Sequence, residues 1–293
     1  MKAAQEKGTD VHEEAASAFH QINDDGGAKG LTTMVVIPFS TLRDKGAIPR
    51  RSILNPTQDH APVTALGPDD HVIFFSQRWL TPSPRAVATP DDAVGTKYKQ
   101  LMTACRAYGK MNGIKEKNIW VWMDFSSVDQ DDDEELIRGV NSLALYVCSC
   151  DAFISIDHAD YFNRGWCLME CMFADASKTP RYILSADDEL KPMDINMRLE
   201  CKSPCEGSFT VESDREIMKV LEEMGSMITV RLDRGIAFNF LDDAKTQGST
   251  HKSKAAPALP AAAAAPVAGG TNKPREVMIP NLPWWLSFAP CAF

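Results

Sequence analysis

The sequence contains no apolar segment long enough to cross a membrane and none near its first residue that could act as a secretory signal. The longest apolar stretch, residues 143–156, is interrupted by Asp151. A membrane-spanning helix needs about 20 consecutive, mostly apolar residues. We therefore expect no membrane partner and a cytoplasmic location.

Positive charge is scarce as well. The 293 residues include 31 Lys and Arg against 40 Asp and Glu, which gives a formal net charge of -9. Proteins that bind nucleic acid mainly through its phosphates carry an excess of basic residues. We therefore expect no nucleic acid among the partners of this chain.

The eight cysteines lack the two-residue spacing of zinc-binding knuckles, and no pair of histidines accompanies them. Neighbouring cysteines are separated by one or three residues, as in Cys148 and Cys150 or Cys167 and Cys171. No Gly-rich phosphate-binding loop follows an expected strand, which argues against a P-loop enzyme or a dehydrogenase. We expect reduced thiols in the core, no metal and no resident cofactor.

An acidic run at residues 129–135 invites comparison with a calcium-binding loop. The comparison fails because Glu134 stands where the turn glycine belongs and Val140 where the bidentate glutamate belongs. Negative charge is favourable in the first turn of a helix. The run therefore predicts a helix start with a solvated face.

The chain divides into four parts by composition. Residues 1–30 are polar and acidic, and we expect them to be disordered or frayed. Residues 31–245 have the composition of one folded domain, and residues 246–274 are an Ala/Pro-rich linker. Residues 275–293 contain two Trp and two Phe, so we expect this tail to dock on its own domain or on a partner.

Nearly continuous apolar runs predict strands that are buried on both faces, which is typical of a parallel sheet. These runs are residues 71–75, 119–123, 152–156, 182–184 and 227–230. Apolar residues at helical spacing between them predict crossover helices, and SDRE at residues 213–216 reads as a capping box. We predict an α/β domain with a doubly wound parallel sheet of about five strands. Residues 34–39 add an edge strand, because Pro38 is poorly tolerated in a sheet centre.

In such sheets the ligand crevice lies beyond the carboxyl ends of the strands. Ser76, Arg78 and Trp79 follow the first predicted strand, and Asp124 follows the second. Two interpretations of Arg78 and Trp79 stay open. Trp79 is either a lid that packs on the following loop or, with Arg78, part of a stacking and phosphate-binding pair.

Glu170 is the residue that most needs an explanation. Its helix reads GWCLMECMFA, which is apolar on every face, so we expect a buried carboxylate. Trp166 stands one turn earlier on the same face. An indole beside a carboxylate could hold a cationic ring and stabilise positive charge that develops next to it. Alternatively, Glu170 pairs with Arg164 or Arg78 and fastens the helix to the first strand.

The order of these elements resembles a Toll/interleukin receptor (TIR) domain. The resemblance lies in a strand ending at Ser76, a strand ending at Asp124, an acidic-headed helix, the strand at 153–156, and then the run YFNRGWCLME that ends at Glu170. A helix with Trp-Cys-x-x-Glu is the hallmark of that family.

The same stretch also resembles the fungal heterokaryon-incompatibility domain, a distant relative of the TIR fold. Its two typical runs are Trp-x-Asp-x-x-Cys-x-x-Gln and Arg-Gly-Trp-Thr-Leu-Gln-Glu. The matching residues are Trp122, Asp124 and Gln130 for the first run, and Arg164, Gly165, Trp166, Leu168 and Glu170 for the second. Together the resemblances cover roughly residues 70–185.

The resemblance implies a flavodoxin-like domain that cleaves the N-glycosidic bond of NAD, with NAD as substrate rather than cofactor. It implies that Glu170 is catalytic, that Trp166 shapes the pocket, and that Ser76, Arg78 and Asp124 line it. A role in cell-death or defence signalling would follow. The alternative is a non-catalytic TIR-like module that signals by self-association, and a homo-oligomer is expected in either case.

Overall fold

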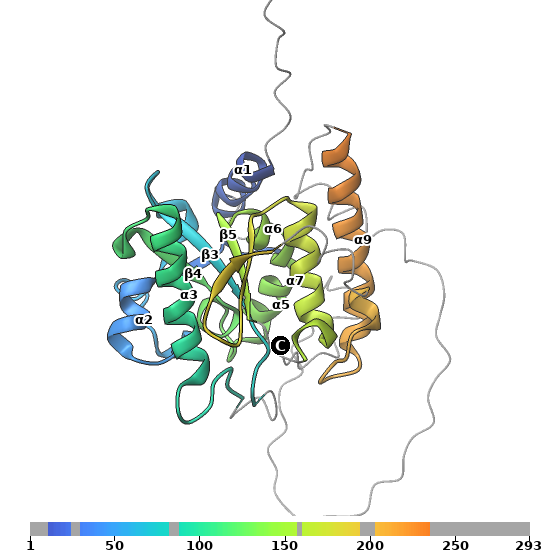
Figure 1. Cartoon of the computed structure of the whole chain (residues 1–293). Helices are drawn as coiled ribbons and strands as arrows, with labels where there is room; N and C mark the ends of the chain where they lie inside the picture. The colour runs from blue at the N-terminus through green and yellow to red at the C-terminus, as the bar shows by residue number, and fades with distance from the viewer. Residues whose placement is uncertain (1–10, 25–29, 82–87, 157–159, 194–202, 235–293) are drawn as a thin grey trace, which may run out of the picture.

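The computed structural model describes residues 11–24, 30–81, 88–156, 160–193 and 203–234. The predicted linker at 246–274 and the aromatic tail at 275–293 lie outside these residues. The described part forms three layers, in which a mixed sheet is covered by helices on both faces (Figure 1). The α/β class predicted from the sequence is confirmed.

The sheet has seven strands in the order β2-β1-β4-β3-β5-β6-β7. The strands are β1 (Val35–Pro38), β2 (Ala61–Pro62), β3 (His71–Ser76), β4 (Ile119–Trp122), β5 (Ala152–Ile156), β6 (Arg181–Leu184) and β7 (Leu190–Pro192). Strands β4, β3, β5 and β6 are parallel to one another, whereas β1 pairs antiparallel with β4, β2 with β1, and β7 with β6.

Helices cover both faces of the sheet because the parallel strands are apolar on both sides. Along β3, Val72 and Phe74 belong to one core, while Ile73 and Phe75 belong to the other. This alternation is the period of two that a strand imposes on its side chains. The apolar run at 71–75 therefore fills two cores at once, as expected for a buried parallel strand.

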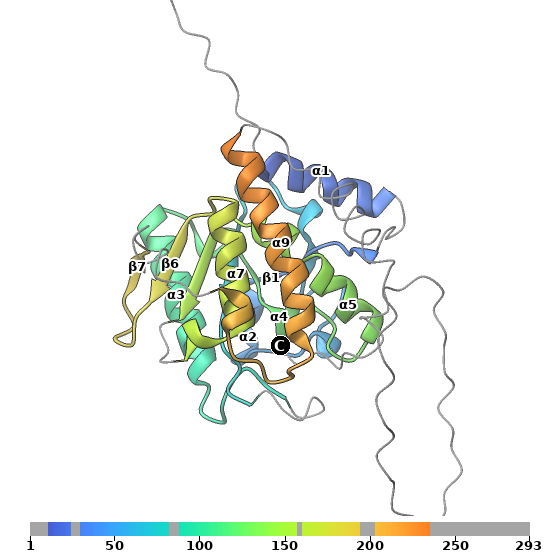
Figure 2. The same ribbon diagram turned by 90° about the vertical axis from the view of Figure 1, so that its right-hand side faces the viewer.

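The helices divide unequally between the two faces. One face carries α2 (Phe39–Lys45) and α3 (Thr96–Asn112). The other face carries α1 (Val11–Asp24), α5 (Asp133–Asn141), α6 (Leu143–Cys148), α7 (Gly165–Ala176) and α9 (Asp214–Asp233). Figure 2 shows α9 lying outside α7, and the two helices contact each other. A short helix, α4 (Asp124–Ser127), follows β4.

The remaining short elements are 3-10 turns. They are η2 (Arg51–Ile53), η3 (Val63–Ala65), η5 (Glu116–Asn118), η6 (Tyr161–Asn163) and η7 (Pro204–Glu206). None of the helices in the described part of the chain has both the length and the apolar character needed to cross a bilayer.

The predicted fifth parallel strand at residues 227–230 is wrong, because these residues belong to α9. Their apolar side chains continue a helical pattern, in which Ile217, Leu221 and Ile228 are buried. Val230 remains 46% exposed, which a strand buried on both faces would not allow. The sheet therefore has four parallel strands, and its extra strands are antiparallel.

Two further expectations need correction. The expected disorder of residues 1–30 does not hold for Val11–Asp24, which form α1 and pack Phe19 and Ile22 into the core. The capping box at residues 213–216 does not form, because the Ser213 side chain makes no capping hydrogen bond. The predicted strand at 34–39 exists as β1, but β2 lies outside it, so β1 is not the edge itself.

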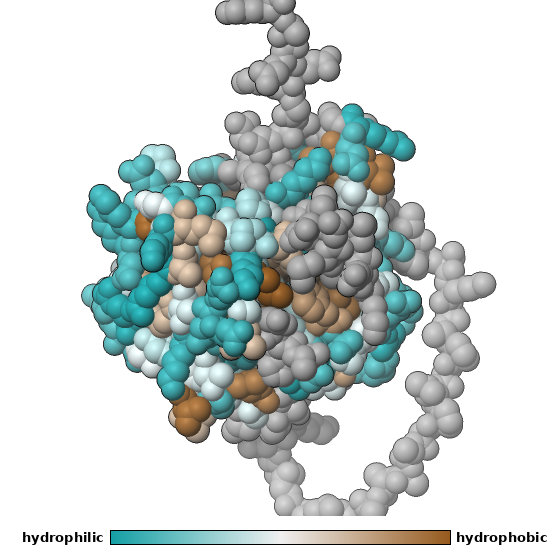
Figure 3. All heavy atoms as spheres, in the orientation of Figure 1, coloured by the Kyte–Doolittle hydropathy of each residue, from teal (hydrophilic) through white to brown (hydrophobic). Residues whose placement is uncertain are grey.

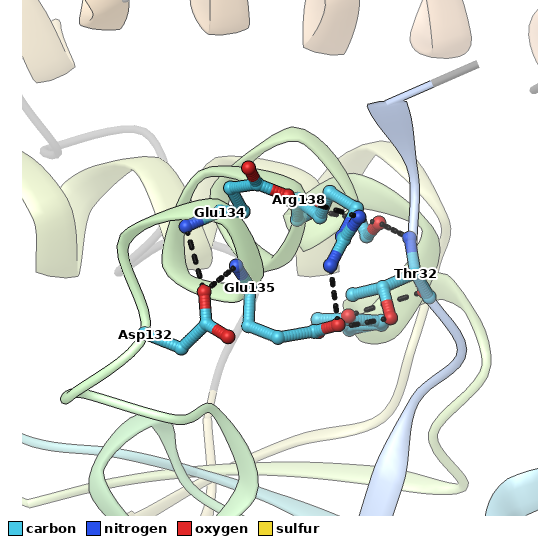
Figure 4. Close-up of polar contacts among 7 residues, drawn as sticks. Thr32, Asp132, Glu134, Glu135 and Arg138 are labelled. Carbon is cyan, nitrogen blue, oxygen red and sulfur yellow. Dashed lines mark hydrogen bonds and ion pairs between the residues drawn. The ribbon is translucent and has the colours of Figure 1, made fainter. Parts of the chain in front are cut away.

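The acidic run at 129–135 starts a helix, as predicted. The Asp132 carboxylate accepts hydrogen bonds from the backbone N–H groups of Glu134 and Glu135 at 2.9 and 3.1 Å, and so caps α5 (Figure 4). Glu135 in turn pairs with Arg138 at 2.6 Å and accepts a hydrogen bond from Thr32 at 3.3 Å. These carboxylates serve the helix terminus and its contact with the segment before β1.

Candidate functional site

The strand order reverses between β3 and β5, which pair in parallel although β4 lies between them in the sequence. At such a switch point the loops after the two strands diverge to opposite faces and leave a crevice at their carboxyl ends. Ser76 is the last residue of β3. Tyr161 lies in η6, on the connection from β5 to α7. Glu170 on α7 completes the group.

The Glu170 carboxylate is joined to β3 by a chain of buried hydrogen bonds. The Ser76 hydroxyl donates to Glu170 Oε2. Tyr161 Oη lies 2.5 Å from Ser76 Oγ and 3.5 Å from Cys171 Sγ. Because Ser76 donates its one proton to Glu170, Tyr161 is the donor to Ser76. This series of hydrogen bonds therefore connects η6, β3 and α7, and its last donor, Ser76, bonds to the Glu170 carboxylate.

Burial raises the pKa of Glu170 to about 8, and the negative charge of Asp124 contributes to the rise. The hydrogen bond from Ser76 acts in the opposite direction and lowers the pKa. The residue is 6% exposed. No arginine or lysine in the described residues forms an ion pair with it. Arg78 pairs instead with Asp160 at 3.5 Å, and Arg164 donates to Thr210 at 2.5 Å. The alternative in which an arginine fastens Glu170 is therefore not what the structure contains.

Asp124 and Trp79 form a second buried pair, between the segments that follow β4 and β3. The Trp79 indole N–H donates to Asp124 Oδ2 at 2.6 Å, and the Phe125 backbone N–H donates to Oδ1 at 2.8 Å. Trp79 also packs edge-to-face on the Phe125 ring. Burial raises the pKa of Asp124 to about 6, although both hydrogen bonds lower it. Trp79 thus holds the segment after β3 against α4, the short helix after β4.

Trp166 is turned toward α9 rather than toward β3. Its indole N–H donates to Asp214 Oδ2 at 2.9 Å, and the ring is 5% exposed. Asp214 is the first residue of α9, and burial raises its pKa to about 6. The indole therefore fixes α9 against the N-terminal turn of α7, the helix that carries Glu170.

The predicted site residues are thus brought together in part. Ser76 contacts Glu170 directly, and Trp79 contacts Asp124 directly, whereas Arg78 and Trp166 have their own acidic partners. Tyr161 and Asp214 were not assigned a role from the sequence. Tyr161 stands in the motif run that carries the resemblance, so its position after a strand was a usable signal. The role of Asp214 was overlooked because the residue lies in a run that resembled a capping box.

A metal ion has no ready ligand set in this arrangement. Within the described residues, His, Cys, Asp and Glu side chains do not gather in groups of three or more that could hold a metal ion. The described cysteines are free thiols, and burial raises the pKa of Cys167 well above its usual value.

Comparison with known proteins adds no relative. No protein-family model, no curated protein and no solved structure matches this chain. The TIR resemblance remains a prediction from the sequence, and a function has to be inferred from the residues and geometry of the site.

Proposed function

We propose that this chain hydrolyses the N-glycosidic bond between nicotinamide and ribose in NAD or a related nucleotide, with Glu170 as the catalytic residue. The observation that carries the proposal is a buried carboxylate at the switch point of the sheet that has a serine donor and no basic partner among the described residues. Burying a carboxylate in this way opposes stability. A functional site is a sufficient reason to keep it.

The topology supports a flavodoxin-like core with four parallel strands. In the order β4-β3-β5-β6 the second parallel strand lies beside the first, and the third and fourth follow on the other side. This order matches the first four strands of the flavodoxin-like order 2-1-3-4-5, in which ligands bind beyond the first and third strands. Ser76 at the end of β3 stands at that point.

The chemistry of the bond suits one carboxylate. When the bond between ribose C1′ and the ring nitrogen breaks, its electron pair goes to the nitrogen and nicotinamide leaves neutral. Positive charge moves to the ribose as an oxocarbenium ion, which a nearby carboxylate stabilises. Water then bonds to C1′, and one proton is released.

Glu170 must be ionised to play this role, and in the free protein its raised pKa keeps much of it protonated at neutral pH. A cationic nicotinamide ring next to it favours the charged form and lowers its pKa again. The Ser76 hydrogen bond acts in the same direction. Binding of the substrate would thus generate the carboxylate that the reaction needs.

The test is release of nicotinamide from NAD by the purified full chain at micromolar concentration. We expect release by the wild type, a loss of at least about 100-fold in Glu170→Gln, and full activity in Glu223→Gln. Glu223 lies on the exposed side of α9 and provides a matched control. Equal release by wild type and Glu170→Gln, or no release by the folded wild type at any oligomeric state, would overturn the proposal.

No described surface favours the alternative of a pure interaction module. The large apolar side chains that are exposed, Ile53, Val94, Met111 and Val230, come from separate segments. In the view of Figure 3 the strongly hydrophobic atoms lie in several places among hydrophilic ones. Self-association through residues 275–293 stays a prediction from the sequence.

A further inference from the structure

Lys97 is a buried cation near the candidate site. It lies in the first turn of α3 and is 1% exposed. The two nearest acidic side chains in sequence are already engaged. Asp92 accepts hydrogen bonds from Val94 and Thr96, and the two oxygens of Asp91 accept the backbone N–H groups of Lys97 and Tyr98 at 2.7 and 2.9 Å. The Lys97 ammonium has no ion pair and no hydrogen bond in the described structure. Burial of an unpaired ammonium is unfavourable unless a ligand completes it.

Gln77 is a second buried polar side chain without a partner. It is 6% exposed, and both its amide nitrogen and its amide oxygen are buried without a hydrogen bond in the described structure. It directly follows Ser76 and stands two residues after Phe75, which packs in the core on the α3 side. Since side chains alternate along a strand, Gln77 continues toward α3. Buried amides without partners are rare and need an explanation.

Arg78 brings a further positive charge to the same region. It acts on Lys97 and also on Arg164, at the start of α7, and it disfavours the charged form of both. Burial is the larger reason why the pKa of Lys97 and of Arg164 is lowered. Arg78 itself has only the exposed Asp160 at 3.5 Å as a partner in the described ion pairs. Arg78 follows β3 directly and Lys97 lies in the first turn of α3, so both cations lie at the carboxyl end of β3, and Arg164 lies at the start of α7 beyond the neighbouring β5.

We infer that Lys97, Gln77 and Arg78 bind the phosphate groups of the substrate, in a subsite next to Glu170. Lysine and arginine side chains are suited to phosphate oxygens, and the Gln77 amide supplies a neutral donor. The inference rests on the proposed function for the identity of the substrate and adds its anionic end. A nucleoside diphosphate would place its phosphates on Lys97 and its ribosyl bond near Glu170.

The test is calorimetric titration of the full chain with ADP, sodium pyrophosphate and adenosine. We expect ADP to bind the wild type and Glu223→Gln with equal affinity, and Lys97→Met to weaken binding at least tenfold. Lys99→Met, on the exposed side of the same helix, should bind like the wild type. Adenosine should bind at least tenfold more weakly than ADP. Comparison with pyrophosphate shows whether the subsite recognises phosphate groups alone or a whole nucleotide. Tight binding of ADP or of pyrophosphate supports the proposed subsite.

Equal binding of ADP by Lys97→Met and the wild type would overturn the inference, as would absence of ADP and pyrophosphate binding at millimolar concentration. If Lys97→Met does not fold, Arg78→Met decides, because the Arg78 side chain is 30% exposed and its replacement leaves the buried Lys97 in place. We expect Arg78→Met to weaken ADP binding at least tenfold and Lys99→Met to leave it unchanged. Equal ADP binding by Arg78→Met and the wild type would then overturn the inference.

The two proposals fail in different ways. Binding of ADP that depends on Lys97, without release of nicotinamide from NAD, keeps the phosphate subsite and removes the proposed reaction. Release of nicotinamide that depends on Glu170, with unchanged KM in Lys97→Met, keeps the reaction and removes the subsite.

Discussion

Glu170 is subject to two opposing influences. Burial in an apolar helix favours its protonated form, whereas the hydrogen bond from Ser76 favours the ionised form. Burial is the larger effect, so the pKa rises to about 8. A carboxylate with this pKa is poised to change its charge when a cationic ligand arrives, which a carboxylate paired with arginine would not do.

The raised pKa makes stability depend on pH in a known direction. The unfolded chain ionises Glu170 near its usual pKa, whereas the folded chain resists ionisation up to about 8. The contribution of this residue to folding is therefore fully present below pH 4.5 and is lost as the pH rises through 8. The unfolding free energy of Glu170→Gln relative to the wild type should therefore rise by about 2 kcal/mol or more from pH 5 to pH 8. This follows from about 1.4 kcal/mol per unit of pKa difference.

Urea denaturation at pH 5 and pH 8 measures this gain, with Glu223→Gln as the control that should show no such difference. A wild type and a Glu170→Gln variant whose difference in unfolding free energy is the same at both pH values would contradict the buried, unpaired carboxylate. A loss of more than about 2 kcal/mol in Glu170→Gln at neutral pH would point to a structural partner instead.

Ser76 should set the pH at which the site becomes active. Ser76→Ala removes the hydrogen bond that favours the ionised carboxylate and leaves the buried Tyr161 hydroxyl with one partner fewer. We expect the rising limb of kcat/KM, near pH 8 in the wild type, to move to higher pH, and stability to fall by about 1–3 kcal/mol. Tyr161→Phe keeps the Ser76 donor, so its limb should stay close to that of the wild type. Identical profiles for Ser76→Ala and the wild type would contradict this role.

At the scale of elements, close packing at two glycines fixes the position of α7, the helix that carries Glu170. Gly165 is the first residue of α7, and a Cβ atom built there would lie 2.2 Å from the Phe209 ring. Gly225 on α9 would meet Met172 Cε at the same 2.2 Å. The first neighbour is a rigid ring and the second a flexible chain end. Of these two glycines, Gly165 is therefore the one that strongly resists a larger residue.

Gly165→Ala should displace Phe209 and destabilise the protein by about 1–3 kcal/mol, the usual effect of overpacking. The same change at Gly67 should be nearly neutral, because its nearest neighbour would be the Asp70 carboxylate at 3.6 Å. Thermal and chemical denaturation of the two variants provide the measurement. If Gly165→Ala were as stable as Gly67→Ala, Phe209 would not hold the start of α7.

The elements also show what the sequence could reveal. Continuous apolar runs found β3, β4, β5 and β6 because each strand is buried on two faces. The same signal failed at residues 227–230, where a short apolar run cannot distinguish a strand from a buried helix. Strand β2 has two residues and β7 three, which is too short for any pattern. Helix α1 was missed because its apolar face is narrow and its flanks are polar.

The site was predictable in its position but not in its pairing. Strand ends and an apolar helix with one carboxylate led to Ser76 and Glu170, which are in contact. The partners of Arg78 and Trp166 depend on how η6 and α9 approach α7, which a single sequence does not encode locally. Lys97 gave no signal, because a lysine in the first turn of a helix is ordinarily exposed.

At the scale of the whole molecule, the aromatic residues of the tail at 275–293 remain to be accounted for. Two Trp and two Phe carry too much apolar surface to remain in water, and an Ala/Pro-rich tether at 246–274 keeps them near the domain at an effective concentration of about a millimolar.

Deleting residues 275–293 should therefore lower Tm by about 2 °C or more if the tail docks on its own domain. If the tail bridges copies, deletion should lower the mass measured by light scattering. Replacing both Trp284 and Trp285 by Ala should reproduce the effect at nearly full length. A truncated chain with the same oligomeric state by light scattering and the same Tm as the full chain would show that the tail neither docks on its own domain nor joins two copies.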